Sequence, residues 1–251
     1  MHIINSFLIA VSFISIIPVP EKFYVDWNND NLKYFCLMLP LTGIILFVPA
    51  WLALWLGLSH LANLSTILRG LLMTLAALAL TGGLHMDGLL DTCDAVFSRQ
   101  DRETRIKILD DSHSGAFAVM GCVSALMLKT LLFAELFSCD SVSTFHIALI
   151  PLSSRLGMGI ILAFMKFAKS TGLAVILGSS RSSCVKYLLV IILAVLLICD
   201  FVTGIILICI MLLWCRICSK IFGGITGDLL GAFVEVSEII LLAGQVIRHC
   251  I

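Results

Sequence analysis

The chain has 251 residues, of which 60% are hydrophobic and only 13% are charged, and its mean hydropathy is +1.11. A soluble domain carries about 25% charged residues, so this composition excludes an ordinary soluble protein and indicates a polytopic membrane protein. The net charge is zero, so no basic field favours a nucleic-acid partner. The ten cysteines lie mostly singly in apolar runs, where Cys packs as a small hydrophobe, so they indicate no disulfide or zinc framework.

The N-terminal segment at residues 3–17 is apolar but short. A helix needs about 20 apolar residues to cross a bilayer, and this run ends early, at Pro18 and Pro20. The segment therefore predicts a short helix that is re-entrant or lies in the membrane interface, with a full crossing as the alternative.

The rest of the chain predicts an all-α bundle. Apolar runs at 34–57, 67–83, 115–137 and 144–165 each predict one helix. The next run, 187–215, would form a helix of about 43 Å, which exceeds a hydrocarbon core of about 30 Å. Asp200 interrupts this run, so we expect two helices joined by a turn at 199–203, and then a last helix at 229–248. The prediction is about seven transmembrane helices plus the short N-terminal helix, in a single membrane-embedded domain, 1–251.

The basic residues predict how these helices are oriented. Twelve of the sixteen Lys and Arg residues lie in four segments, 21–33, 84–113, 166–186 and 216–228. The intervening turns contain none. With seven helices, all four segments fall on one side, which the positive-inside rule assigns to the cytoplasm.

Three aspartates, Asp87, Asp91 and Asp94, occur in the segment TGGLHMDGLLDTCDAVFS. Their spacing of i, i+4 and i+7 places the three carboxylates on one face of a helix. Like charges this close repel unless a cation neutralises them, and Mg²⁺ prefers oxygen ligands while leaving positions open for substrate phosphates. We therefore expect a metal site here. His85, just before the triplet, could be a general base or could only support its neighbours by hydrogen bonding.

A second group of polar residues lies later in the chain. Asp110 and Asp111 precede the helix predicted at 115–137, and a glycine-rich segment, GGITGD, occupies 223–228. The glycines could relieve close helix packing or expose backbone N–H groups to a phosphate. These glycines are Gly223, Gly224 and Gly227.

Four charged residues fall within predicted spans. Glu235 and Glu238 lie three residues apart, hence on one helix face, and burying them costs several kcal/mol unless they are paired or line a polar cavity. Arg155 is their natural counter-charge or a phosphate ligand itself, and Lys129 needs an anionic partner if it lies at mid-span. These residues indicate a Mg²⁺-dependent membrane transferase acting on a phosphorylated substrate, with Arg155, Glu235 and Glu238 among the residues that bind it.

The motifs TGGLHMDGLLDTCDAVFS, ILDDSHSGAFAVMG and GGITGDLLGAFVEVSEIILL resemble the cobalamin synthase family, the adenosylcobinamide-GDP ribazoletransferases. The resemblance covers essentially the whole chain. It implies that the 5′-hydroxyl of α-ribazole, or of α-ribazole 5′-phosphate, attacks the cobinamide-bound phosphate of adenosylcobinamide-GDP. GMP leaves, and adenosylcobalamin or its 5′-phosphate forms in the bacterial cytoplasmic (inner) membrane, with the active site on the cytoplasmic side.

The resemblance also implies roles for single residues. Asp87, Asp91 and Asp94 would hold Mg²⁺ and pyrophosphate and take part in catalysis. Asp111, the family's aspartate before the glycine of ILDDSHSGAF, would be catalytic, and Asp228, the aspartate of the glycine-rich loop, would bind substrate. The chain departs from the family where Asp110 and Ser112–Ser114 replace positions that are often basic. The oligomeric state is open, and a homo-oligomer is compatible with the sequence.

Two other functions fit the sequence motifs less well. A CDP-alcohol phosphotransferase also uses helically spaced aspartates, but its motif continues D-G-x-x-A-R, whereas this chain reads D-G-L-L-D-T. A solute transporter would place its charges near the bilayer midplane between repeated halves, and the sequence shows no repeat.

Overall fold

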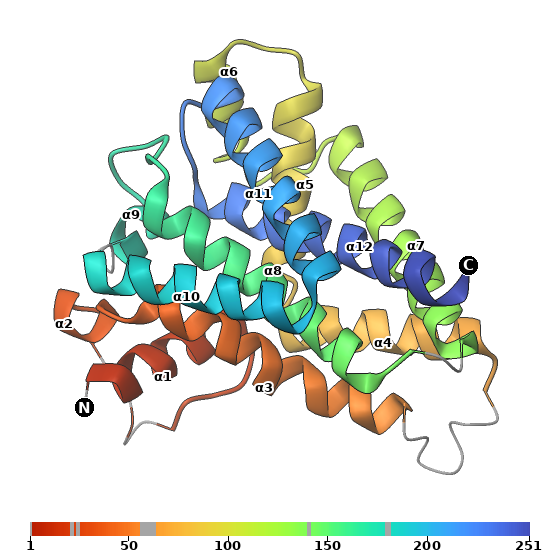
Figure 1. Cartoon of the computed structure of the whole chain (residues 1–251). Coiled ribbons are helices and arrows are strands. Elements are labelled where there is room, and N and C mark those ends of the chain that lie inside the picture. Colours follow the sequence, from red (N-terminus) through yellow and green to blue (C-terminus); the bar gives the residue numbers. More distant parts are fainter. Residues whose placement is uncertain (1, 21–22, 24–25, 56–63, 140–141, 179–181) are drawn as a thin grey trace.

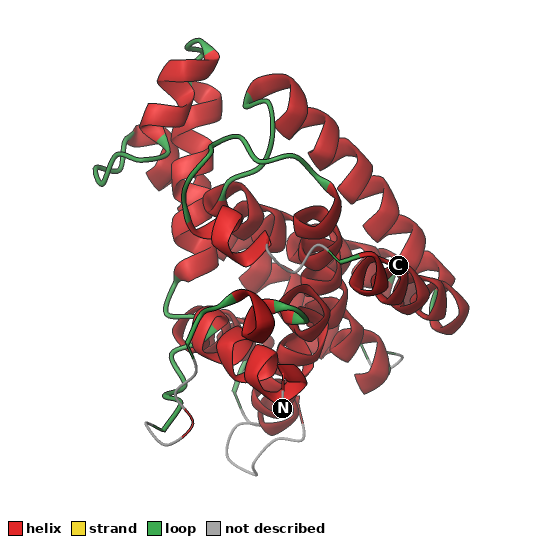
Figure 2. Cartoon of the chain, turned by 90° about the vertical axis from the view of Figure 1, so that its left-hand side faces the viewer, coloured by secondary structure: helices red, strands yellow, loops and turns green. Residues whose placement is uncertain are grey.

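The computed structural model describes residues 2–20, 23, 26–55, 64–139, 142–178 and 182–251. In this part of the chain the fold is all-α, as Figure 2 shows, and the single β-type contact is an isolated bridge between Phe167 and Ile225. The helices are α1 His2–Ile14, α2 Asn29–Leu32, α3 Phe35–Trp55, α4 Thr66–Leu80, α5 Leu84–Phe97, α6 Arg102–Ile108, α7 Ala116–Ser138, α8 Thr144–Phe164, α9 Leu173–Leu177, α10 Ser183–Cys199, α11 Phe201–Ile221 and α12 Gly227–Cys250.

Each apolar run of the sequence forms a helix, so the all-α prediction is confirmed. The runs correspond to α3, α4, α7, α8, α10, α11 and α12. The long run at 187–215 is divided between α10 and α11 at Asp200, whose side chain accepts a hydrogen bond from the backbone N–H of Thr203 at 3.3 Å. An aspartate in this position satisfies an N–H group that a helix start leaves without a partner, so it ends one helix and begins the next.

Four helices are each long and apolar enough to cross a membrane. They are α7, residues Phe145–Phe164 of α8, α11 and α12. Helices α4 and α5 pass this test only together, with a bend of 93° between them. Among the described residues α1, Phe35–Ile45 of α3 and α10 are apolar but shorter. The chain is therefore a multi-pass membrane protein, and the expected count of seven crossings stays a prediction.

Helix α12 runs from the middle of the bundle to its edge, where the chain ends (Figure 1). It packs against α5, α7, α8 and α11, while α3 packs on α8 and α4 packs on α7. Its apolar residues are largely buried, among them Leu229, Phe233, Val234 and Leu241 at 1% exposure or less. A residue at the start of α12 is therefore held in place by several other helices.

The bend between α4 and α5 depends on two glycines. Gly82 and Gly83 have φ values of +59° and +76°, a left-handed conformation that residues with a Cβ atom rarely adopt. The turn is also crowded, because a Cβ atom on Gly82 would lie 2.6 Å from the side chain of Ile16. The two glycines thus let the chain turn sharply and direct α5 away from α4 (Figure 1).

Candidate active site

The three aspartates of the triplet lie on α5, as predicted, but they do not have the same surroundings. Asp94 accepts hydrogen bonds from the backbone N–H groups of Gly115 and Ala118, the latter at 2.9 Å. These groups belong to the first turn of α7, where N–H groups have no partner within the helix. Asp94 therefore caps α7 from a neighbouring helix. This leaves Asp87 and Asp91 as the members of the triplet that are free of such a backbone contact in the described residues.

Asp228, in the first turn of α12, is the third aspartate of this cluster, beside Asp87 and Asp91. The backbone of Asp228 packs on Gly88 of α5 so closely that a Cβ atom on Gly88 would lie 2.6 Å from the Asp228 carbonyl oxygen. Gly88 thus lets the two helices touch at this level. Residues 140 positions apart in sequence are brought together by this contact.

The charges around Asp91 act on its ionisation. Helix α5 is outside the four helices that can cross a membrane on their own. Burial and then the negative charges of Asp87, Asp228 and Asp94 raise the pKa of the Asp91 carboxyl to about 7. Carboxylates that disfavour each other's charge are stabilised by a cation between them. The electrostatics of this cluster therefore suit a bound metal ion or another positive group.

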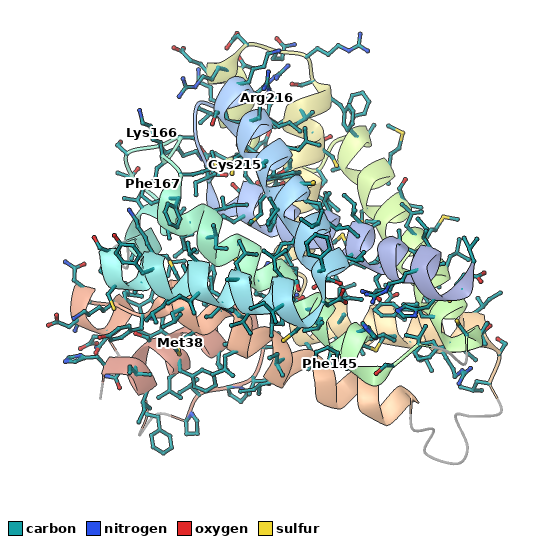
Figure 3. The ribbon with its side chains drawn as sticks, in the orientation of Figure 1. Met38, Phe145, Lys166, Phe167, Cys215 and Arg216 are labelled. Atoms are coloured by element: carbon teal, nitrogen blue, oxygen red, sulfur yellow. The ribbon has the colours of Figure 1, made fainter. Side chains whose placement is uncertain are left out.

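Two loops bring further polar groups to the same place. The chain after α8 pairs with the glycine-rich segment, because Ala168 N–H donates to the Ile225 carbonyl and Ile225 N–H donates to the Lys166 carbonyl, both at 2.9 Å. Figure 3 shows Lys166 and Phe167 on this loop. The pairing positions Lys169, whose ammonium group contacts the Asp110 carboxylate.

These residues surround a cavity of about 190 Å³, which we call the polar cavity. It lies between the start of α12, the start of α5 and the loop that contains Lys169. Its polar and glycine lining is His85, Asp87, Asp110, Lys169, Thr171, Gly172, Thr226, Gly227, Asp228 and Gly231. The N-terminus of α12, with its partial positive charge, is thus at the wall of the cavity, as in many sites that bind phosphate.

His85 is one of the residues that line this cavity and is only 1% exposed. Its Nε2 atom is buried and has no hydrogen-bond partner among the described residues. Gly231 of α12 packs against the His85 backbone, with an added Cβ atom 3.2 Å from its Cα. Burial and then the positive charge of Arg155 lower the pKa of His85 to about 3, so the imidazole is neutral.

The three glycines of the glycine-rich segment have different environments. Gly223 has a φ of +76° and faces the Arg102 guanidinium. Gly224 packs on the backbone of the loop after α8, where an added Cβ atom would lie 2.6 Å from the Lys166 carbonyl oxygen. Both therefore allow close packing. Gly227 has no atom within 4 Å of an added Cβ, and it lines the polar cavity. It is the glycine of the three that leaves room for a ligand.

Asp111, which was expected to be catalytic, is outside this cavity. Its carboxylate accepts from the backbone N–H of His113 at 3.0 Å and contacts the His113 ring at 2.8 Å, and both side chains are largely exposed. The hydrogen bonds from His113 lower the pKa of Asp111. Its neighbour Asp110 lines the cavity in its place, paired with Lys169.

The four charged residues of the spans form one buried ion cluster. Lys129 Nζ lies 2.5 Å from Glu235 and 2.6 Å from Glu238. Glu238 also binds the Arg155 guanidinium. All four residues are at most 8% exposed. The expected partners of Lys129 and of the glutamates are thus confirmed, and the cluster is separate from the polar cavity, whose lining does not include it.

The oxygen ligands of the site fit Mg²⁺ in kind. Among the described residues no group of three His, Cys, Asp or Glu side chains converges closely enough to hold a metal ion by itself. Mg²⁺ needs no such cage, because it usually keeps several waters and binds through one or two carboxylates plus substrate phosphates. Asp87 and Asp91 lie one turn apart on α5, and the negative charge of Asp228 acts on Asp91. They are the two carboxylates that such a site needs.

Sequence reasoning missed two features of this site. Lys169 was counted only as one of the basic residues that orient the helices, yet it lines the cavity. The contact of Asp94 with α7 was also missed. The only signal for it was the absence of a capping side chain at Gly115, the residue before α7.

The fold and the site together define a class of protein, a polytopic helical membrane protein with an acidic cavity beside a helix N-terminus. The chain belongs to the cobalamin-5-phosphate synthase family, whose model matches residues 6–246.

Curated relatives support this assignment. An adenosylcobinamide-GDP ribazoletransferase of Lachnoclostridium phytofermentans is 32% identical over 97% of this chain and 93% of its own length. Proteins of the same name from Halalkalibacterium halodurans and Desulfitobacterium hafniense are 33% and 34% identical, over 96% and 94% of this chain and 94% of their own lengths. The comparison with solved structures found no match.

Proposed function

We propose that this protein is an adenosylcobinamide-GDP ribazoletransferase. It transfers the cobinamide-phosphate moiety of adenosylcobinamide-GDP to the 5′-hydroxyl of α-ribazole, or of α-ribazole 5′-phosphate, and releases GMP. Family membership and the names of its relatives support this reaction. The observation that carries the proposal is the convergence of Asp87 and Asp91 with Asp228 beside the polar cavity.

The residues around the cavity have complementary tasks in this reaction. The N-terminus of α12 and the Lys169 ammonium are the positive groups of the cavity, so they bind the oxygens of the diphosphate. Asp87 and Asp91 would hold Mg²⁺, which when bound neutralises charge on the phosphate oxygens. Asp228, across from Gly88 on the other helix, accepts the proton of the attacking 5′-hydroxyl.

This assignment differs from the sequence-based one at two positions. Asp94 is placed as a cap of α7, and Asp110 replaces Asp111 at the cavity. Arg155, Glu235 and Glu238, expected to bind substrate, act in this proposal by fixing the helices that carry the cavity.

The basic residues support an active site on the cytoplasmic side of the membrane. Arg102 meets the glycine-rich segment, and Lys169 lines the cavity itself. Figure 3 shows Lys166 on the loop after α8 and Arg216 near the C-terminal end of α11. A cysteine introduced by Glu103→Cys, in a variant without the exposed native cysteines, should react with a membrane-impermeant maleimide only after the cells are opened. Labelling of intact cells would contradict this orientation.

The reaction is tested with the full-length protein in liposomes. Adenosylcobinamide-GDP and α-ribazole should yield GMP, and a chelator should abolish its release until Mg²⁺ is added in excess. Asp91→Asn should lower turnover on the order of 10²-fold or more, whereas the control Asp30→Asn, at an exposed position in α2, should not. Turnover by Asp91→Asn at the wild-type rate would disprove the metal assignment.

A parallel assay separates the alternative enzyme class. CDP-diacylglycerol and an alcohol should yield no CMP under the same conditions. Release of CMP without release of GMP would show that the protein is a CDP-alcohol phosphotransferase.

A further inference from the structure

A second cavity meets the polar cavity at Asp87. It has a volume of about 570 Å³ and is broadly open, and its apolar wall is formed by Phe13, Ile16, Leu78, Met86 and Leu90, with Cys122 at its edge. We call it the apolar trough. Asp87 is the one charged residue in its lining, and Phe13, Leu84 and Asp87 line both cavities. Asp87 is therefore shared by the two cavities.

The trough is formed at the corner where α4 bends into α5. Ile16 lies two residues beyond the end of α1. It is fixed at this corner because its backbone N–H donates to the Leu80 carbonyl at 3.0 Å and its side chain faces Gly82. Despite these contacts Ile16 is 63% exposed. An exposed apolar side chain that is held rigidly at the edge of a cavity suits a ligand with an apolar surface.

The sizes of the two cavities distinguish their ligands. Pockets for drug-sized molecules have volumes of about 300–1,000 Å³. The polar cavity, at about 190 Å³, is below this range, and the trough, at about 570 Å³, is within it. The donor substrate joins a compact charged diphosphate to a much larger corrinoid, whose periphery carries methyl groups as well as amide side chains. Of the two cavities only the open trough can receive part of the corrinoid, with ring methyl groups against its apolar wall.

We infer that the apolar trough binds the corrinoid half of adenosylcobinamide-GDP, an inference that rests on the proposed function. The corrinoid lies against Ile16 and Leu90, and its phosphate arm reaches Asp87, where the trough opens into the polar cavity. The charged diphosphate then lies beside Lys169 and the N-terminus of α12. The phosphorus atom under attack is thereby held at the junction of the two cavities.

The test introduces a charge into the apolar wall. Ile16→Glu should raise the KM for adenosylcobinamide-GDP at least ten-fold and leave the KM for α-ribazole unchanged. Ile4→Glu is the matched control, because Ile4 belongs to α1, is 62% exposed and does not line the trough. Thermal unfolding of the variants verifies that they fold.

Binding of cobinamide, a corrinoid without the nucleotide, provides a second readout. The wild-type protein and Ile4→Glu should bind it, and Ile16→Glu should bind it at least ten-fold more weakly. An increased KM for α-ribazole alone would assign the trough to the acceptor, and unchanged constants would leave it as a lipid-facing groove; each result overturns the inference. Cobinamide binding that depends on Ile16 in a protein that releases no GMP would support the trough and refute the proposed reaction.

Discussion

The buried ion cluster allows a quantitative test of how the bundle is held together. Lys129 and Arg155 balance Glu235 and Glu238, so the cluster is neutral, and all four residues are at most 8% exposed. Lys129→Met leaves one buried negative charge without compensation. Removing one partner from a buried ion pair costs about 3–5 kcal/mol. For a chain of this length, about 2–4 °C is lost per kcal/mol, so Tm should fall by roughly 6–20 °C.

The double variant Lys129→Met, Glu235→Gln makes this test specific. It removes one charge of each sign and keeps the contact between Arg155 and Glu238. Its stability should return to within about 2 kcal/mol of the wild-type value. Thermal unfolding in detergent, followed by tryptophan fluorescence, measures the stability of the wild type, the two single variants and the double variant. Lys107→Met, at an exposed lysine of α6, is the control and should change stability by no more than about 0.5 kcal/mol. A single variant as stable as the wild type, or a double variant less stable than the single one, would refute the reasoning.

Two further predictions concern aspartates whose carboxylates cap the start of a helix. Asp94→Ala should lower the free energy of unfolding by about 0.5–2 kcal/mol, because two N–H groups of the first turn of α7 lose their acceptor; a denaturation curve equal to that of the wild type would contradict the capping role. At Asp200, burial opposes ionisation, but the hydrogen bonds from Thr203 and the charge of Arg248 outweigh it and lower the pKa of the carboxyl. Its stabilisation is therefore complete above the unfolded pKa of about 3.9 and is lost as the pH falls toward the lowered folded value. Thermal unfolding between pH 7 and pH 3 should show a smaller loss of stability for Asp200→Asn than for the wild type, and equal losses would contradict the assignment.

The helical elements could be predicted from the sequence because they follow from local chemistry. Apolar runs form helices in a membrane protein because backbone groups must be satisfied within the segment. Asp200 could be recognised as a break because a charge in an apolar run is costly unless it has partners. The short helices α2, α6 and α9 were not predicted. They contain only four to seven residues, so they have too few turns for an apolar period to show.

The candidate site was predictable in its composition but not in its geometry. The spacing of Asp87, Asp91 and Asp94 correctly placed all three on one helix. It could not show that the Asp94 carboxylate accepts a hydrogen bond from the Gly115 N–H, because that contact joins residues 21 positions apart through the fold. The position of Lys169 likewise depends on the pairing of two loops through Ile225. Such pairings are tertiary, so no local pattern encodes them.

The ion cluster and the cavity are connected through one helix, and this connection decides between two roles for the cluster. Asp228, Glu235 and Glu238 lie at i, i+7 and i+10 of α12 and therefore near one face, with Asp228 about 10 Å along the axis from Glu235. The contacts of Lys129 and Arg155 thus fix the rotation of α12, and with it the position of Asp228. If this is the role of the cluster, turnover should fall with stability in Lys129→Met and recover with stability in the double variant. A double variant that regains its Tm but not its turnover would show instead that Glu235 acts on the substrate, as its place in the sequence first suggested.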